Sequence, residues 1–251
     1  MTDKVVYHTG HEKSLHVCIK IAAKTGFPLE HVKDYKIGTT PIVYGLFRGT
    51  DAPIRKARWS GLNCYYVDHG YMQATKTNYY VNGANNDYSG YYRVVKNGMF
   101  ADYGQDTNDS NLNQLHLCMK PMYDASANTR HHAIICAPSL EGSMFLPEHK
   151  VWPEEWIEGV KHQLESFGYI VEVSTKHEGN KLTDKDMSKY ALAVSHDSAT
   201  IVYTLLHGVP SDNLSLYNQY GISTEKERYK YLSHLANNQY KLDDINVECF
   251  K

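Results

Sequence analysis

The sequence predicts an α/β protein with two Rossmann-like lobes that face a central cleft. Short, nearly continuous apolar runs alternate with helical patterns over 1–75 and again over 131–208. Such runs are typical of parallel strands that are covered on both faces. Between them, a stretch rich in Asn, Asp, Tyr, Gly and Ser interrupts the alternation. We therefore expect an N-terminal lobe over 1–130, which includes an insertion at 75–130, and a C-terminal lobe over 131–251.

The first lobe opens with a strand and an amphipathic helix. The β-branched and aromatic run at 5–9 predicts a strand that ends at Gly10. Apolar residues at helical spacing then predict a helix over 14–26, which stops at Gly26. The other elements expected in this lobe are strands at 41–47 and 63–70, with a short helix between them at 54–61.

The polar insertion carries one alternating segment, 91–97, which favours a hairpin or an irregular insertion over a crossover helix. It contains no low-complexity repeat. We expect it to be ordered and to form a wall of the cleft.

The second lobe repeats the alternation. A helix over 153–168 has Pro near its start, acids in its first turn and Gly at its end. The other expected elements are strands at 131–139, 169–175 and 190–197, a helix at 198–208, and a closing helical tail at 227–238 and 242–250.

Composition excludes several classes of protein. The 251 residues are 42% hydrophobic with a mean hydropathy of -0.52, and no apolar run approaches the ~20 residues of a membrane helix. The start lacks the features of a signal peptide, so we expect a cytoplasmic protein without membrane affinity. The five cysteines are scattered without a CxxC pair, which favours reduced, packed thiols over disulfides or zinc.

Charge and aromatic content leave two interpretations open. Residues 1–75 hold 10 Lys/Arg against 6 Asp/Glu, and the remaining residues hold 16 against 22. A basic face on the first lobe could meet a polyanion, although ordinary surface scatter explains the numbers equally well. The 21 tyrosines could stack on unpaired bases or simply pack within strands. The 14 histidines form no HxH or HExxH motif, so we predict no metal site.

The most informative segment is the strand at 190–197 and the helix that follows it at once. The backbone N–H groups of Ser198, Ala199 and Thr200 are expected to be free at this helix start. Such groups favour a phosphate oxygen. The alternative is simple capping, because Asp197 or Ser198 is a good N-cap by itself.

This segment resembles the donor-binding element of glycosyltransferases with the two-Rossmann GT-B fold. The matching residues are Ser195-His196-Asp197-Ser198-Ala199-Thr200, followed by Leu205-Leu206-His207-Gly208-Val209-Pro210. Three further segments, covering together with it about a third of the chain, resemble small phage-encoded GT-B-like proteins: 65–72, 91–98 and 231–245. One departure is that 201–206 lacks the acid that often binds the donor ribose or sugar, and Tyr203 stands in that region.

The resemblance implies a nucleotide-diphosphate sugar, UDP-linked, as donor substrate, with no further cofactor. Its implied acceptor is 5-hydroxymethylcytosine or 5-hydroxymethyluracil in phage DNA, modified with glucose, arabinose or a similar sugar. A duplex acceptor would require base flipping. Candidate donor contacts besides the helix start are Ser139, after the first strand of the second lobe, and Lys176 and His177, after the next strand; Lys176 could instead be a solvated surface lysine.

Candidate acid–base residues lie at strand ends of the first lobe. Asp68 and His69 end the strand at 63–70, and a carboxylate and an imidazole suit proton removal from an acceptor hydroxyl. We expect Asp68 to be the base, with His69 its partner or the base itself; a structural role for Asp68 in the following turn is the alternative. His8, beside Gly10, is a second candidate.

Basic residues supply candidate anion contacts. Arg48 could neutralise the departing diphosphate or contact an acceptor phosphate, and Arg93 could do the same from the insertion. Arg55, Lys56 and Arg58 are candidate contacts to DNA. Two other functions stay open: a glycan-directed glycosyltransferase, and a non-catalytic nucleotide-binding phage protein that would not need Asp68.

Overall fold

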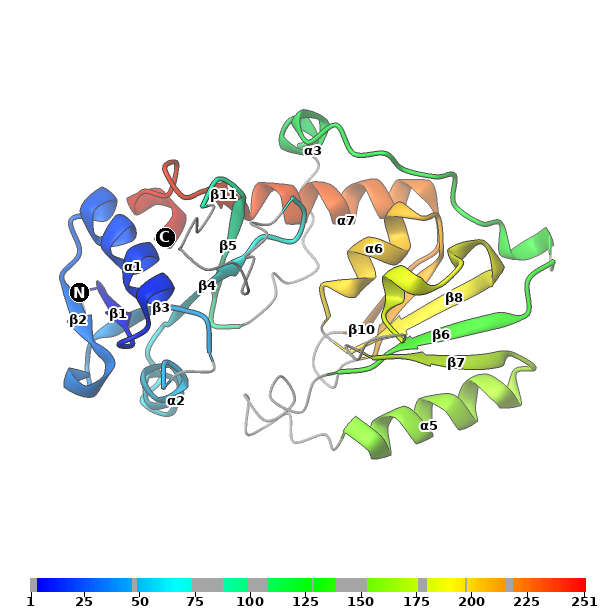
Figure 1. Cartoon of the computed structure of the whole chain (residues 1–251), viewed down its shortest axis with the longest axis horizontal. Helices are drawn as coiled ribbons and strands as arrows, with labels where there is room; N and C mark the ends of the chain where they lie inside the picture. Colours follow the sequence, from blue (N-terminus) through cyan, green and yellow to red (C-terminus); the bar gives the residue numbers. More distant parts are fainter. Residues whose placement is uncertain are drawn as a thin grey trace, which may run out of the picture. The chain divides into compact units, whose positions relative to one another are not determined.

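The chain folds into two compact units, each built around its own sheet (Figure 1). Unit 1 comprises Met1–Ala101 and Leu235–Lys251, and unit 2 comprises Asp102–His234. The computed structural model describes residues 4–46, 49–73, 88–98, 108–127, 129–138, 153–175, 180–196, 198–214 and 219–251. The mixed α/β class with two largely parallel sheets agrees with the prediction.

The sheet of unit 1 has the strand order β11-β5-β4-β3-β1-β2. Strands β1 to β4 pair in parallel, whereas β5 runs antiparallel to both β4 and β11. The strands are β1 (Lys4–His8), β2 (Leu29–His31), β3 (Thr40–Tyr44), β4 (Tyr65–His69), β5 (Tyr91–Lys96) and β11 (Gln239–Lys241).

The sheet of unit 2 repeats this order as β10-β9-β8-β6-β7. Its strands are β6 (His132–Cys136), β7 (Ile170–Ser174), β8 (Tyr190–Ser195), β9 (Ser211–Leu214) and β10 (Gln219–Ile222). In each sheet the first strand lies between the second and the third, the fourth follows the third in parallel, and the next along the chain is antiparallel. Both units therefore share the doubly wound order 2-1-3-4.

The helices pack mainly against the sheet of their own unit. In unit 1, α1 (Glu12–Thr25) packs on β1 and β3, and α2 (Asp51–Trp59) packs on β3. In unit 2, α5 (Pro153–Ser166) lies along β6 and β7, and α6 (Thr200–Leu206) packs on β8 and β9 (Figure 1). The remaining helical segments are α3 (Ser110–Gln114), α7 (Glu225–Asn237), η1 (Val32–Asp34), η2 (Ala125–Ala127), η4 (Leu182–Asp184), η5 (Met187–Lys189) and η6 (Val247–Phe250).

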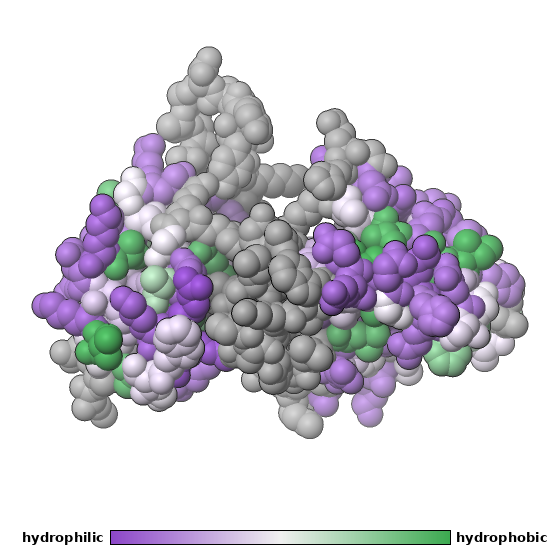
Figure 2. Space-filling model, turned by 90° about the horizontal axis from the view of Figure 1, so that it is seen from below, coloured by the Kyte–Doolittle hydropathy of each residue, from purple (hydrophilic) through white to green (hydrophobic). Residues whose placement is uncertain are grey.

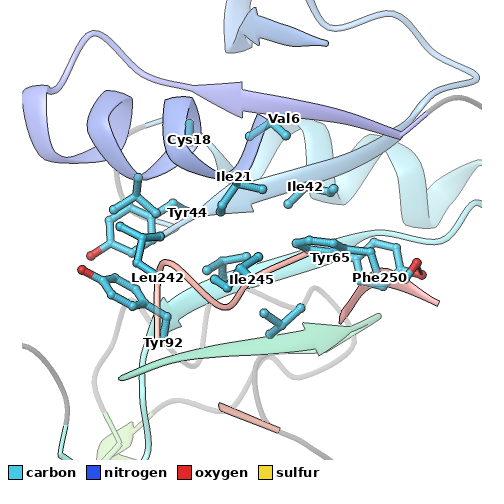
Figure 3. Close-up of a cluster of buried hydrophobic side chains, with 13 residues drawn as sticks. Val6, Cys18, Ile21, Ile42, Tyr44, Tyr65, Tyr92, Leu242, Ile245 and Phe250 are labelled. Carbon is cyan, nitrogen blue, oxygen red and sulfur yellow. Dashed lines mark hydrogen bonds between the residues drawn. The ribbon is translucent and has the colours of Figure 1, made fainter. Parts of the chain in front are cut away.

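The core of unit 1 takes side chains from both ends of the chain. Val6, Ile21 and Ile42 come from the first elements, and Ile245 and Phe250 come from the last residues (Figure 3). The Phe250 ring meets Tyr65 edge to face, with ring centroids 5.4 Å apart, and the Tyr65 hydroxyl donates to the Phe250 carbonyl oxygen at 2.9 Å. The C-terminal segment is thus part of the core of unit 1.

Because of this packing, the observed domain boundary differs from the expected one. The sequence placed all of 131–251 in the second lobe, but 235–251 belongs to unit 1 because β11 pairs with β5 and the residues after it fill the core. In the expected helix at 242–250, only the short turn η6 forms. Within the expected insertion, the alternating segment forms β5, a regular member of the sheet.

A carboxylate on strand β7 of unit 2 binds the segment before β8, although β6 lies between the two strands in the sheet. Glu172 accepts hydrogen bonds from Lys189, from Lys185 at 3.5 Å and from the Tyr190 hydroxyl at 2.9 Å. Burial would raise the pKa of Glu172, but the hydrogen bonds from Lys189 and Tyr190 and the lysine charges outweigh it and lower the pKa. The ionised form therefore stabilises the fold.

We expect Glu172→Gln to lower the free energy of unfolding by about 1 kcal/mol at pH 7, since the pair is partly exposed. Because the folded pKa lies below the unfolded one, the loss should be full above the unfolded pKa and vanish as pH falls through the folded pKa. Urea unfolding of both proteins between pH 7 and pH 3 measures this. An equal difference at every pH would contradict the charge argument.

Candidate functional site

Each sheet has one point at which the winding direction reverses. In doubly wound sheets, ligands bind at this point, beyond the carboxyl ends of the strands. In unit 1 it lies between β1 and β3, where β1 ends at His8. In unit 2 it lies between β6 and β8, which end at Cys136 and Ser195. Among the described residues predicted from strand ends, His8 lies at the first point, and Ser198, Ala199 and Thr200 follow β8 at the second.

His8 is half-buried, and its contacts define its tautomer. The Nδ1 atom lies 2.9 Å from the carbonyl oxygen of Thr9. A carbonyl oxygen only accepts, so Nδ1 of the neutral ring carries the proton and Nε2 keeps its lone pair. The His8 ring also meets that of His31 edge to face, with centroids 5.1 Å apart. This geometry suits proton acceptance at Nε2.

His69 has the same tautomer as His8, but its Nε2 atom is already engaged by a lysine. Its Nε2 lies 3.2 Å from the Nζ of Lys13, and an ammonium group only donates. Nε2 therefore accepts and Nδ1 carries the proton; Nδ1 has no hydrogen-bond partner among the described residues. Burial lowers the pKa of His69, and the lysine charge acts in the same direction against the opposing effect of Asp68. His69 is thus a neutral donor and is poorly suited to be a base.

Asp68 does not pair with His69, because successive side chains of β4 point to opposite faces of the sheet. Its Oδ2 accepts hydrogen bonds from the Tyr66 hydroxyl and, at 3.1 Å, from Arg93 directly across on β5. The Arg93 guanidinium is only 7% exposed and lies between the rings of Tyr66 and Tyr71, at 5.4 and 5.3 Å. Arg93 thus offers no surface to a DNA phosphate, and one oxygen of Asp68 is already occupied.

We expect Asp68→Asn to lower the free energy of unfolding by about 3 kcal/mol, because it removes the carboxylate charge that pairs with the buried Arg93. This is the low end of such costs, since the Asp68 side chain is 26% exposed. Asp51→Asn is the matched control: its partner Arg55 is exposed, so the expected cost is below about 1 kcal/mol. Urea unfolding measures both, and equal costs would contradict the argument.

The basic residues of α2 lie at the surface. Arg55 and Lys56 are exposed, Arg58 is half-buried, and Arg55 is already paired with Asp51. Trp59, which the sequence interpretation did not use, is 78% exposed at the end of the same helix. The described surface is mostly hydrophilic on the face drawn in Figure 2, with hydrophobic residues in separate patches. Arg48 lies outside the described residues.

In unit 2, the expected phosphate-binding residues come together after β8. The Ser198 hydroxyl accepts hydrogen bonds from the backbone N–H of Thr200 at 3.3 Å and from its hydroxyl at 2.8 Å, so it caps the turn into α6. Ala199 is exposed beside it. Burial raises the pKa of the Cys136 thiol to about 11 despite a hydrogen bond with Thr200, which places Thr200 beside the end of β6. Ser139, Lys176, His177 and Asp197 lie outside the described residues.

Two buried residues near these strand ends were given no role by sequence reasoning. His196 is buried after β8, with its ring 5.5 Å from that of Trp156 on α5. Lys13, in the first turn of α1, is also buried. The signal for Lys13 was its place in the first turn of the helix that follows the first strand and Gly10.

In the described part of the chain, no group of three or more His, Cys, Asp or Glu side chains could hold a metal ion. None of the helices in this part has the length and apolar character needed to span a membrane.

Comparison with known proteins gives a likeness in structure alone. No protein-family profile matches the chain, and no curated protein matches its sequence. Two similar solved structures are of Thermosulfurimonas dismutans KpsC. The first, a β-Kdo 2,4-transferase, is 13% identical with a TM-score of 0.54 and covers 93% of this chain and 91% of its own. The second, a β-Kdo 2,7-transferase, is 11% identical with a TM-score of 0.52 and covers 97% and 94%. The chain therefore shares the fold of these transferases.

Proposed function

We propose that the protein is a glycosyltransferase that moves a sugar from a nucleotide-diphosphate sugar, UDP-linked, to an acceptor hydroxyl. The main support is the repeated 2-1-3-4 sheet, which provides two separate binding points at strand ends within one chain. The likeness in fold to two Kdo transferases over nearly the whole chain agrees with this function.

The donor contacts are assigned to unit 2. Ser198, Ala199 and Thr200 follow β8 at the reversal point, where their polar groups suit the diphosphate. Ser139, Lys176 and His177 complete the proposed donor set from the loops after β6 and β7. Ribose recognition must come from outside 201–206, which holds no acid.

The acceptor chemistry is assigned to unit 1. In the proposed step, Nε2 of His8 takes the proton of the acceptor hydroxyl while the hydroxyl oxygen forms a bond to the anomeric carbon of the donor sugar. The bond from that carbon to the donor diphosphate breaks, and the diphosphate leaves with the electron pair. Asp68, held by Arg93 and Tyr66, is the alternative base or an acceptor-binding carboxylate.

Two acceptors are supported by different observations. The likeness to Kdo transferases favours a glycan hydroxyl. The charge of unit 1, with 15 Lys/Arg against 10 Asp/Glu, supports DNA that carries a hydroxymethylated pyrimidine, with Arg55, Lys56 and Arg58 as phosphate contacts.

The test is transfer from a panel of nucleotide-sugars to Kdo-containing oligosaccharides and to DNA with 5-hydroxymethylcytosine or 5-hydroxymethyluracil, read by mass. A sugar-sized mass gain on one acceptor class supports transfer and identifies the acceptor. Calorimetric binding of a nucleotide-sugar without transfer to any acceptor would favour a non-catalytic nucleotide-binding protein. Neither binding nor transfer would overturn the proposal.

A further inference from the structure

Helix α2 of unit 1 has a basic outer side. Its buried residues are apolar, whereas Arg55 and Lys56 are exposed and Arg58 is half-buried. The helix contains one acid, Asp51, which pairs with Arg55. Three basic residues against one acid leave a net charge of +2 on nine residues. Several neighbouring cations suit a polyanion, because each of them can neutralise one of its charges.

Trp59 is the last residue of the same helix, and its side chain is 78% exposed. No other ring packs against it within the described ranges. The helix dipole favours basic residues in the last turn of a helix, but it gives no reason for an exposed indole there. A flat aromatic ring beside cations suits a ligand that combines negative charge with aromatic faces.

The positive charge continues from α2 to the adjacent edge of the sheet. Nη1 of Arg58 lies 3.5 Å from the carbonyl oxygen of Asn97, which follows the exposed Lys96 at the end of β5. The ammonium groups of Lys4 and Lys96 lie 5.3 and 5.9 Å from the centroid of the same ring, that of Tyr65. Burial and the neighbouring charge of Lys96 lower the pKa of Lys4. Cations are thus crowded at this edge, which favours binding of an anion.

Trp59 lies at the edge of the sheet opposite to His8. Helix α2 connects the parallel strands β3 and β4, so it begins near their carboxyl ends and ends near their amino ends. A helix of this length spans about 13 Å. A ligand that lies along α2 therefore runs from Trp59 toward the edge at which β1 ends with His8.

Helix α5 of unit 2 provides a contrast. It is followed by Phe167, which is 72% exposed, so it also carries an exposed aromatic ring near its end. Its sequence holds four acids against one lysine, which gives a net charge of -3. This charge repels a polyanion, so the two helices differ in the property that the ligand would read.

We propose that Trp59, together with Arg55, Lys56 and Arg58, forms a binding surface for single-stranded nucleic acid. The cations contact phosphates along the strand, and the indole stacks on one unpaired base. Trp59 is the only exposed large apolar residue of α2, which suits one base but offers too little apolar area to anchor the helix in a bilayer. The bases of a duplex already stack on one another, so the indole favours an unpaired strand.

As an acceptor surface, it rests on the proposed function with DNA as the acceptor. The base that stacks on Trp59 differs from the base that reacts, because His8 lies at the other edge of the sheet. The surface therefore holds the strand beside the modified base and reads no sequence. A single-stranded acceptor also needs no base flipping.

The experiment is a titration of fluorescein-labelled oligo(dT) with the full chain, without donor, followed by fluorescence anisotropy at several salt concentrations. Trp59→Ala should weaken binding about 10- to 100-fold, the usual loss of one stacked base, and Trp59→Phe less than about fivefold because a ring remains. Lys56→Met should weaken binding about threefold to tenfold and reduce the slope of log K against log salt by about 0.7. Phe167→Ala is the matched control and should bind like the native protein. Circular dichroism checks that each variant is folded.

Two competing ligands separate this partner from other polyanions. Tighter binding of the single strand than of the matched duplex supports the surface. A duplex that binds more tightly, or equal affinity of native protein and Trp59→Ala, would overturn it. So would binding to vesicles that contain anionic phospholipid, or to an acidic polysaccharide, without binding to oligo(dT). Because no donor is present, failure of this titration leaves transfer to a glycan standing, and binding without any transfer supports the surface while the glycosyltransferase proposal fails.

Discussion

Replacing His8 with glutamine is expected to lower kcat/KM for sugar transfer by about 10²- to 10⁴-fold, the usual contribution of a positioned proton acceptor. Glutamine can still donate a hydrogen bond to the Thr9 carbonyl oxygen, which His8 contacts at 2.9 Å, but it cannot take up a proton. The loss should therefore reflect chemistry rather than local geometry. Steady-state kinetics with the best donor and acceptor from the panel measures it.

His31→Gln is the matched control for this substitution. His31 packs against the His8 ring, but its Nδ1 accepts from the backbone N–H of Lys33 at 3.2 Å. Its replacement should lower activity less than tenfold, and donor binding measured by calorimetry should be unchanged in both variants. If His8→Gln keeps nearly full activity while correctly folded Asp68→Asn loses it, Asp68 is the base.

The distinction between these two residues shows how far the sequence could lead. The positions of His8, Asp68 and His69 at the carboxyl edge of one sheet were predicted correctly, because apolar runs in the sequence indicate where strands end. The sequence could not show that Asp68 faces Arg93, since this contact depends on the antiparallel register between β4 and β5. The tautomers of His8 and His69 likewise depend on contacts with Thr9 and Lys13.

No local sequence pattern indicated that the end of the chain returns to unit 1. Strand β11 has three residues and pairs with β5, more than 140 positions earlier in the sequence. Polar strands as short as β9 and β11 carry too few residues for a periodic pattern. The longer strands and helices were predicted correctly because their patterns repeat over several residues.

Phe250→Ala is expected to lower the free energy of unfolding of unit 1 by about 3–5 kcal/mol. The ring is fully buried against Tyr65 and Phe27, with centroid distances of 5.4 and 6.1 Å, so truncation leaves a cavity. The backbone of Phe250 accepts hydrogen bonds from Tyr65 and Lys4, which hold the last residues in place. Chemical denaturation followed by circular dichroism measures the change.

Phe167→Ala is the matched control, because this phenylalanine is 72% exposed in unit 2. Its removal takes almost no packed surface away and should change stability by less than about 0.5 kcal/mol. A cost below 1 kcal/mol for Phe250→Ala would mean that the C-terminal segment adds little to the core of unit 1. If the cost is large and the protein that remains folded keeps its transfer activity, the C-terminal segment stabilises the sheet on which His8 lies without taking part in the reaction.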